Sequence, residues 1–193
     1  MVLCRLSSRL LAFATLCVAP MGVWSLWPIP TELKTGTTGL RLSPSFSFDV
    51  AISCPPADLL QAVTRTQYYL ENDKLGRLVV GRGANDSSII AGAKSLQSLK
   101  LSLTEGAEVQ PISFESVKPL GTRKEEYTLT IPEDGSEATL AANSTLGLYR
   151  GLTTFSQLWY YYNSVTYTIV APIKIVDAPA YVSISVVTLK GLN

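Results

Sequence analysis

The first residues in this sequence that could carry chemistry are two adjacent carboxylates, Glu133 and Asp134. Two carboxylates that flank one bond can divide the acid and base roles of a hydrolysis between them. These two are neighbours in the segment Pro132-Glu133-Asp134-Gly135, whose composition is typical of a tight turn, so we expect their side chains to point apart into solvent. We therefore interpret them as turn residues rather than as a catalytic pair.

A glycine-rich segment suggests a different chemistry, the binding of a dinucleotide. Gly81-Arg82-Gly83 follows a possible strand over residues 77–80, as a phosphate-binding loop would. The third glycine of that motif is replaced by Asp86, which would place an anion beside the pyrophosphate. The sequence therefore predicts an ordinary turn here, and we expect no cofactor.

Nucleophilic and metal chemistry has little support. The 193 residues contain no histidine, which excludes Ser/His/Asp and Cys/His groups and the imidazole ligands of a catalytic zinc within this sequence. Two of the three cysteines, Cys4 and Cys17, lie near the N-terminus. No base or cation stands beside Cys54 in the sequence, so we expect it to be buried and unreactive. We assign no catalytic, cofactor-binding or metal-binding residue.

Charge and the N-terminal segment bear on the partners and the compartment. The formal net charge is +1, so no electrostatic field would gather nucleic acid, and we expect no nucleic-acid partner. Arg5 and Arg9 precede an apolar run over residues 10–18 that is too short to span a bilayer, and Val23-x-Ser25 offers short residues for cleavage. We predict a signal peptide over residues 1–25. The protein is then expected to be secreted, or delivered to a vacuole or lysosome, without membrane attachment after cleavage.

Two N-glycosylation motifs fit that route, one at Asn85 and one at Asn143. Asn85 falls in a predicted polar loop, whereas Asn143 falls where a predicted strand meets a predicted helix. We expect modification at both positions to be possible in this compartment and favour Asn85.

The hydrophobic pattern predicts an α+β domain. Apolar residues that alternate with polar ones predict strands over 40–50, 99–103, 127–131, 138–142 and 167–175. Helical spacing predicts one helix from Pro55-Pro56 to about Asn72, and another that starts at a Ser144 or Asn143 cap and continues its apolar stripe to Tyr162. In the second helix Gly147 and Gly151 stand one turn apart, which would let a neighbouring backbone approach closely. We expect a mostly antiparallel sheet with two long helices packed on one face.

Four segments of the chain resemble family 20 β-N-acetylhexosaminidases, particularly the fungal ones. They are Leu26-Trp27-Pro28-Ile29-Pro30, the hairpin segment Tyr127 to Pro132, the run Asn143 to Leu158 with its Gly-x-x-Arg-Gly-Leu-x-Thr-Phe-x-Gln-Leu pattern, and the strand end Ile175-Val176-Asp177-Ala178-Pro179-Ala180-Tyr181. The resemblance implies that residues 26–178 form the N-terminal, zincin-like accessory domain of such an enzyme. Arg150 lies within the run, and we assign it a structural role in the helix rather than a role in substrate binding.

In that family the accessory domain precedes a (β/α)8 barrel that removes terminal N-acetylhexosamine residues from glycoconjugates and chitin fragments. After Tyr181 this sequence departs from the family pattern, so we expect residues 179–193 to be a divergent tail where the barrel would begin. The implied partner is the barrel, and such glycans would be reached only through it. By itself the chain is expected to be inactive and to self-associate. The alternative is a stand-alone secreted module that binds a partner or a glycan without catalysis.

Overall fold

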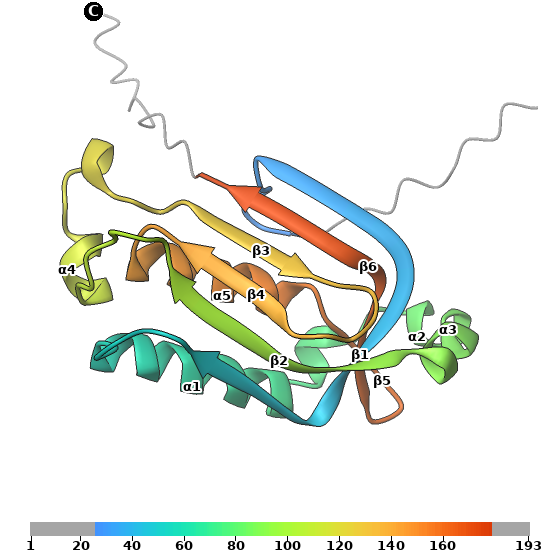
Figure 1. Cartoon of the computed structure of the whole chain (residues 1–193). Coiled ribbons are helices and arrows are strands. Elements are labelled where there is room, and N and C mark those ends of the chain that lie inside the picture. The colour runs from blue at the N-terminus through green and yellow to red at the C-terminus, as the bar shows by residue number, and fades with distance from the viewer. Residues whose placement is uncertain (1–25, 179–193) are drawn as a thin grey trace, which may run out of the picture.

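The computed structural model describes residues 26–178, so the predicted signal peptide and the predicted tail lie outside the described residues. Two long helices cover one face of a six-stranded sheet (Figure 1). The strands are β1 (Glu32–Val50), β2 (Lys94–Leu103), β3 (Tyr127–Ile131), β4 (Ala138–Ala142), β5 (Tyr160–Tyr162) and β6 (Val165–Asp177). The helices are α1 (Ala57–Asn72), α2 (Arg82–Asn85), α3 (Ser87–Gly92), α4 (Ile112–Ser116) and α5 (Thr145–Gln157), with short 3-10 turns at Leu75–Arg77 and Leu120–Thr122.

The α+β prediction is confirmed, and the sheet is mixed. Its order is β1-β2-β4-β3-β6-β5, with a further pairing of β1 to β6. β2 lies parallel to both β1 and β4, and the other pairings are antiparallel. The parallel pairs arise because α1 carries the chain between β1 and β2, and because the β3–β4 hairpin inserts β4 between β2 and β3.

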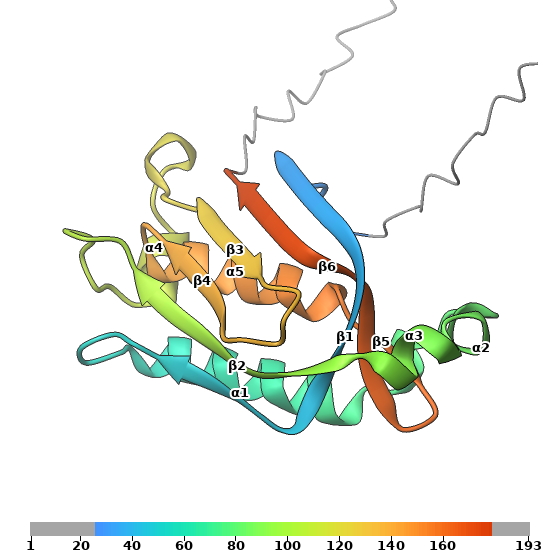
Figure 2. The same ribbon diagram turned by 45° about the vertical axis from the view of Figure 1, so that its right-hand side comes forward.

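A single long strand, β1, replaces the short strands predicted over residues 40–50. Its first half pairs with β6, with Glu32 opposite Val176, and its second half pairs with β2, with Phe48 opposite Leu99. Both views show it bending past the end of the sheet from one edge to the other (Figures 1 and 2). The bend includes a bulge between Leu42 and Ser47, where β1 has several more residues than the β2 segment that it pairs with.

The two predicted long helices are present and lie side by side on the same face of the sheet (Figure 2). α1 starts directly after Pro56 and buries Leu59 and Leu70. α5 begins at the Ser144 cap, whose hydroxyl accepts a hydrogen bond of 3.1 Å from the Gly147 backbone N–H. The apolar stripes of both helices enter one core with the inner face of the sheet.

The C-terminal end of α5 differs from the prediction. The helix stops at Gln157, so the interpretation of Tyr162 as part of its stripe is wrong. Tyr162 belongs to β5, which returns into β6 through Asn163 and Ser164, both with positive φ, in a two-residue hairpin turn. Tyr162 falls at helical spacing from Trp159 only by coincidence, because the chain has already left the helix and entered β5. Trp159 nevertheless lies in the core, against Phe155.

Residues 75–92 form no strand, so the prediction of one over residues 77–80 is wrong. The chain makes a 3-10 turn and then enters the short helices α2 and α3 through Gly81, which has a φ of 77°. Arg77 is buried and donates to the carbonyl oxygens of Asp73 and Ser156 instead of lying in a ladder. Asp86 accepts a hydrogen bond of 2.9 Å from the Tyr167 hydroxyl, which fixes this segment to β6.

None of the helices within residues 26–178 combines the length and the apolar character that crossing a bilayer requires.

Candidate functional site

The residues that the sequence offered as candidates for a functional site do not come together in the described part of the chain. Glu133 and Asp134 are in the turn between β3 and β4, with Gly135 at a φ of 77°. The Asp134 carboxylate accepts from the backbone and the hydroxyl of Ser136, and these hydrogen bonds hold its pKa below the ordinary value. Glu133 accepts instead from Thr38 of β1 at 3.3 Å. The two carboxylates therefore serve different local contacts, as expected of turn residues.

Cys54 is exposed, so the prediction that it is buried is wrong. It lies in the loop between β1 and α1 with a φ of 53°, and this backbone conformation is uncommon for a residue with a side chain. Free cysteines are generally buried, whereas the loop before Pro55 leaves Cys54 exposed. It is free of any disulfide in the described part of the chain.

The two glycosylation motifs have different surroundings. Asn85 ends α2 and is exposed, and the Ser87 of its motif is exposed as well. Asn143 is exposed, but its side-chain amide oxygen Oδ1 accepts a hydrogen bond of 2.8 Å from the Thr104 hydroxyl. The Thr145 of that second motif is fully buried and donates to the Gln110 carbonyl oxygen.

Arg150 joins α5 to the segment before β3. Its Nε lies 2.8 Å from Oε2 of Glu125, whose side chain is buried. Its side chain also lines a cavity of about 580 Å³ between α1, α4 and α5, together with Arg65 and Asp58. Burial acts to raise the pKa of Asp58, but hydrogen bonds from the backbone of Ser113 and Ile112 hold it below the ordinary value. These contacts fasten α4 to the two long helices.

An exposed apolar surface lies on the outer side of the helices. We call it the helix-side patch and define it by Leu60, Tyr68, Tyr69, Val79 and Trp27. The first three line one groove along α1, and Tyr69 and Val79 line a second that also contains Gln157. The Gln157 amide exchanges two hydrogen bonds with the backbone of Trp27, and the Trp27 side chain is 80% exposed. Sequence reasoning missed this surface, although two adjacent tyrosines on a helix whose apolar face was already assigned were a signal.

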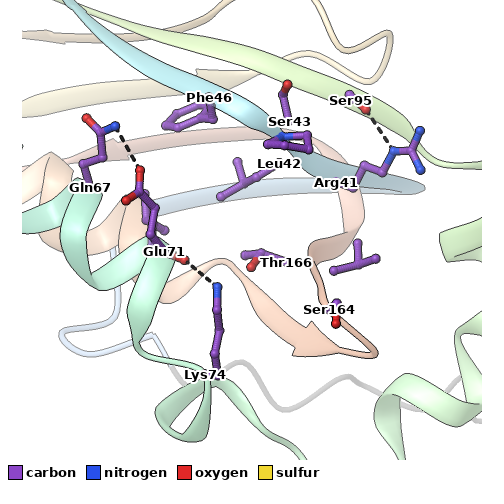
Figure 3. Close-up of a pocket in the computed structure, with 13 residues that line it drawn as sticks. Arg41, Leu42, Ser43, Phe46, Gln67, Glu71, Lys74, Ser95, Ser164 and Thr166 are labelled. Atoms are coloured by element: carbon purple, nitrogen blue, oxygen red, sulfur yellow. Dashed lines mark hydrogen bonds between the residues drawn. The ribbon is translucent and has the colours of Figure 1, made fainter.

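The bulge in β1 borders a pocket, which sequence reasoning also missed (Figure 3). We call it the bulge pocket. It has a volume of about 440 Å³ and lies between the β1 bulge, the last two turns of α1 and the start of β6. Figure 3 shows Thr166 near its centre, with Glu71 of α1 and Lys74, which follows the end of that helix, on one side and Ser43 of β1 on another. The bulge could not have been placed from the hydrophobic pattern of β1 alone, because it depends on pairing with β2, more than 50 residues later in the chain.

Hydrogen bonds fix the walls of the bulge pocket. Arg41 Nε donates to the Ser95 hydroxyl at 2.9 Å, which joins β1 to β2 beside the bulge. On α1, Gln67 Nε2 donates to Oε1 of Glu71 at 3.0 Å. Just after the helix, Lys74 Nζ donates to the Leu70 carbonyl oxygen at 3.5 Å. Within residues 26–178 no group of three or more His, Cys, Asp or Glu side chains is placed to hold a metal ion.

Comparison with solved structures shows which known fold this α+β domain shares. It is similar to part of Flavobacterium johnsoniae chitobiase, with a TM-score of 0.50 and 17% sequence identity over 77% of this chain and 20% of that one. This similarity shows a shared fold.

Sequence comparison then gives the family. The family model described as "beta acetyl hexosaminidase like" matches residues 26–158. The chain is 34% identical to the cat (Felis catus) beta-hexosaminidase subunit beta over 81% of its length and 26% identical to Arabidopsis thaliana beta-hexosaminidase 1 over 69%. This chain belongs to the beta-acetyl hexosaminidase-like family. It spans only 28% and 24% of the lengths of those two relatives.

Proposed function

We propose that residues 26–178 are the accessory domain of a β-N-acetylhexosaminidase and that hydrolysis belongs to a catalytic barrel that works beside it. One observation carries the proposal. The family match covers residues 26–158, which include both long helices and four of the strands, while the chain spans about a quarter of the curated relatives' length. The domain would meet N-acetylhexosamine glycoconjugates or chitin fragments only through that barrel.

The helix-side patch supports a packing role. An exposed apolar groove is typical of a surface that another domain covers. Tyr68 and Tyr69 lie on the outer side of α1, and Trp27 is attached to the end of α5 through Gln157. The same two helices hold the sheet on their inner side. We therefore propose that the barrel rests against the outer side of α1 and the end of α5.

The compartment follows from the predicted signal peptide over residues 1–25. We propose that the chain enters the secretory pathway, reaches the medium or a vacuole or lysosome, and is glycosylated at Asn85 in preference to Asn143. The open position of Asn85 and Ser87 supports that preference, because the Thr145 hydroxyl of the other motif is committed to the Gln110 carbonyl. Glycosidase treatment of the secreted protein tests this: an Asn85→Gln variant that still loses as much mass as the unmodified chain would contradict it.

A second candidate function is a stand-alone secreted binding module. The bulge pocket favours it, because polar side chains gather there around an apolar floor and its lining residues differ from those of the grooves in the helix-side patch. The two functions are compatible, since one concerns the outer side of the helices and the other the bend of β1.

Hydrolysis distinguishes an accessory domain from an enzyme. The whole chain, secreted from a eukaryotic host and purified, is incubated with a chromogenic N-acetylglucosaminide. The proposal predicts no turnover above a mock purification from the same host. Turnover that persists after contaminating host hexosaminidase has been removed, and that scales with the amount of the chain, would overturn it.

A further inference from the structure

We propose that the second groove of the helix-side patch binds the carboxylate of an acidic side chain from a protein partner. We call it the Arg77 groove. It has a volume of about 360 Å³ and is lined by residues of the last turn of α1, the turn over residues 75–77 and the end of α5. The proposal rests on the proposed function in one respect, that another protein domain covers the helix-side patch. The evidence is a buried cation without an ion pair, a second unused donor in the same wall, and an apolar rim.

The cation is the guanidinium of Arg77, a residue that is only 7% exposed. Its Nε donates to the Asp73 carbonyl oxygen at 3.0 Å, and its Nη1 donates to the Ser156 carbonyl oxygen at 3.2 Å. Both acceptors are neutral, and within residues 26–178 no carboxylate lies within 4.0 Å of the guanidinium. A charge that has lost its water without gaining an opposite charge is costly to the fold. A carboxylate bound in the groove would supply that opposite charge.

The other charged residue that lines the groove is Asp73. Burial lowers the pKa of Arg77 from its ordinary value, and the Asp73 carboxylate opposes this change without pairing with the guanidinium. Asp73 is exposed, and its Oδ1 already accepts a hydrogen bond of 2.8 Å from the Gly76 backbone. Water screens an exposed carboxylate more strongly than it screens a buried guanidinium. Arg77 therefore dominates the field that a ligand in the groove would meet.

A second donor in the wall of the groove is also unused. Trp159 lines the groove and is 2% exposed, and its indole Nε1–H has no hydrogen-bond partner among the described residues. The indole is held against Phe155, with ring centroids 5.5 Å apart. A buried N–H without an acceptor is unfavourable. The two oxygens of one carboxylate can accept from a guanidinium and from an indole together.

The rim of the groove favours a protein side chain over a free anion. Tyr69 and Val79 line the groove and remain about half exposed, and Leu78 and Val80 beside Val79 are exposed as well. A free anion would leave this apolar surface in water. A partner that inserts an acidic side chain would cover the surface with the residues around that side chain. An arginine surrounded by apolar contacts is typical of the centre of a protein–protein interface.

Nuclear magnetic resonance of the ¹⁵N-labelled whole chain tests the groove with small probes. Acetate and propionate carry the carboxylates of aspartate and glutamate side chains, and propionamide is the neutral counterpart of propionate. The reporter is the Trp159 indole N–H, which is identified by its loss in Trp159→Phe. We expect propionate to shift this resonance with half-saturation at about 10 mM or lower, and propionamide to bind at least about tenfold more weakly.

Two substitutions and one further probe locate the effect. Arg77→Gln removes the charge and should weaken propionate binding at least about tenfold. Arg65→Gln is the matched control, because Arg65 is exposed on α1 and lines other cavities, so the affinity should not change. Inorganic phosphate, which has no apolar part, should bind more weakly than propionate. Arg77 also fastens its turn to α5, so the comparison of propionate with propionamide is made on the unmodified chain and needs no variant.

Four results would overturn the proposal. They are no shift of the Trp159 indole with either carboxylate, propionamide binding as tight as that of propionate, phosphate binding tighter than that of propionate, and an equal loss of affinity in Arg65→Gln and Arg77→Gln. Each of these results concerns the groove and leaves the accessory role untouched. Hydrolysis of the chromogenic N-acetylglucosaminide would overturn the accessory role without affecting the binding of the probes, so the two proposals fail separately.

Discussion

The two long helices are closely packed on their inner side and carry exposed apolar side chains on their outer side. On the inner side α5 approaches the sheet so closely that a Cβ at Gly147 would lie 2.5 Å from the Glu126 carbonyl oxygen. On the outer side of the helices, Tyr68, Val79 and Trp27 remain exposed. The residues that resemble the family are concentrated in α5. The inner side of the helices therefore specifies the fold, and the outer side is available for contact with a partner.

The largest expected effect comes from filling the inner contact. Gly147→Ala would press a methyl group against a backbone oxygen that cannot move without displacing the segment before β3. Overpacking of this kind costs about 1–3 kcal/mol, offset by about 1 kcal/mol of better helix propensity, so we expect a net loss of up to about 2 kcal/mol in the free energy of unfolding. Chemical denaturation measures it.

Gly92→Ala is the control for that substitution. Nothing lies within 4 Å of a Cβ at Gly92, which ends α3, so its unfolding free energy should change little or rise slightly. Equal losses for both variants would show that the effect is one of glycine in general and not of the α5 contact.

Tyr127→Phe tests the contact between α5 and the sheet from the side of β3. Tyr127 is buried against α5 and its hydroxyl lies 2.6 Å from that of Thr154, so we expect a loss of about 1 kcal/mol at neutral pH. Burial raises the pKa of Tyr127 to about 12 from the ordinary value of 10.0. A raised pKa in the folded state contributes stability that is complete below pH 10 and is lost as the pH rises toward 12.

Comparing the two proteins at alkaline pH isolates the ionisation of Tyr127, because the other tyrosines and the lysines are the same in both. Between pH 10 and 12 the unmodified chain should lose about 2 kcal/mol more stability than Tyr127→Phe, because only the unmodified chain must ionise this phenol on unfolding. Parallel pH profiles for the two proteins would contradict the assignment.

At the edge of the helix layer, Asp58→Asn tests a smaller contact. The Asp58 carboxylate accepts from the Ser113 backbone at 2.9 Å, and its pKa lies below 3.8 in the folded chain although burial opposes this. A lowered pKa contributes stability that is present above the ordinary value and is lost as the pH falls through the folded value. We expect a change within about 0.5 kcal/mol at neutral pH. Acid unfolding should begin at a slightly lower pH in Asp58→Asn, and an unchanged acid profile would contradict the assignment.

Local sequence signals predicted the parts of the fold whose interactions are local. The Ser144 cap, the glycine spacing of α5 and the Pro132 to Gly135 turn each depend on residues within a few positions, and the structure contains all three elements. The bend of β1 could not be predicted, because it depends on pairing with β6, more than 120 residues later in the chain. The short helices over residues 82–92 were missed because their fixed point, the bond from Tyr167 to Asp86, is also a distant contact.

The same distinction applies to the candidate sites. The turn role of Asp134 followed from its neighbours, whereas the exposure of Cys54 depends on how the β1–α1 loop leaves the core. The bulge pocket joins residues of β1, α1 and β6 that no spacing in the sequence relates. The helix-side patch joins residues of α1 to Trp27 and Val79, which lie far from α5 or outside any helix in the sequence, so it is defined only by the folded structure.

The central claim is that the outer side of the helices is a contact surface of an accessory domain. Light scattering of the purified whole chain tests it against a variant that carries Leu60→Ser, Tyr68→Ser and Val79→Ser. A second variant, Phe114→Ser with Val117→Ser and Leu120→Ser, removes the exposed apolar side chains around α4 and serves as the control. We predict that the unmodified chain and the control self-associate and that the helix-side variant is a folded monomer, whose unfolding free energy changes by no more than about 1.5 kcal/mol, about 0.5 kcal/mol for each of the three substitutions. A monodisperse monomer for the unmodified chain at the same concentration would contradict the claim.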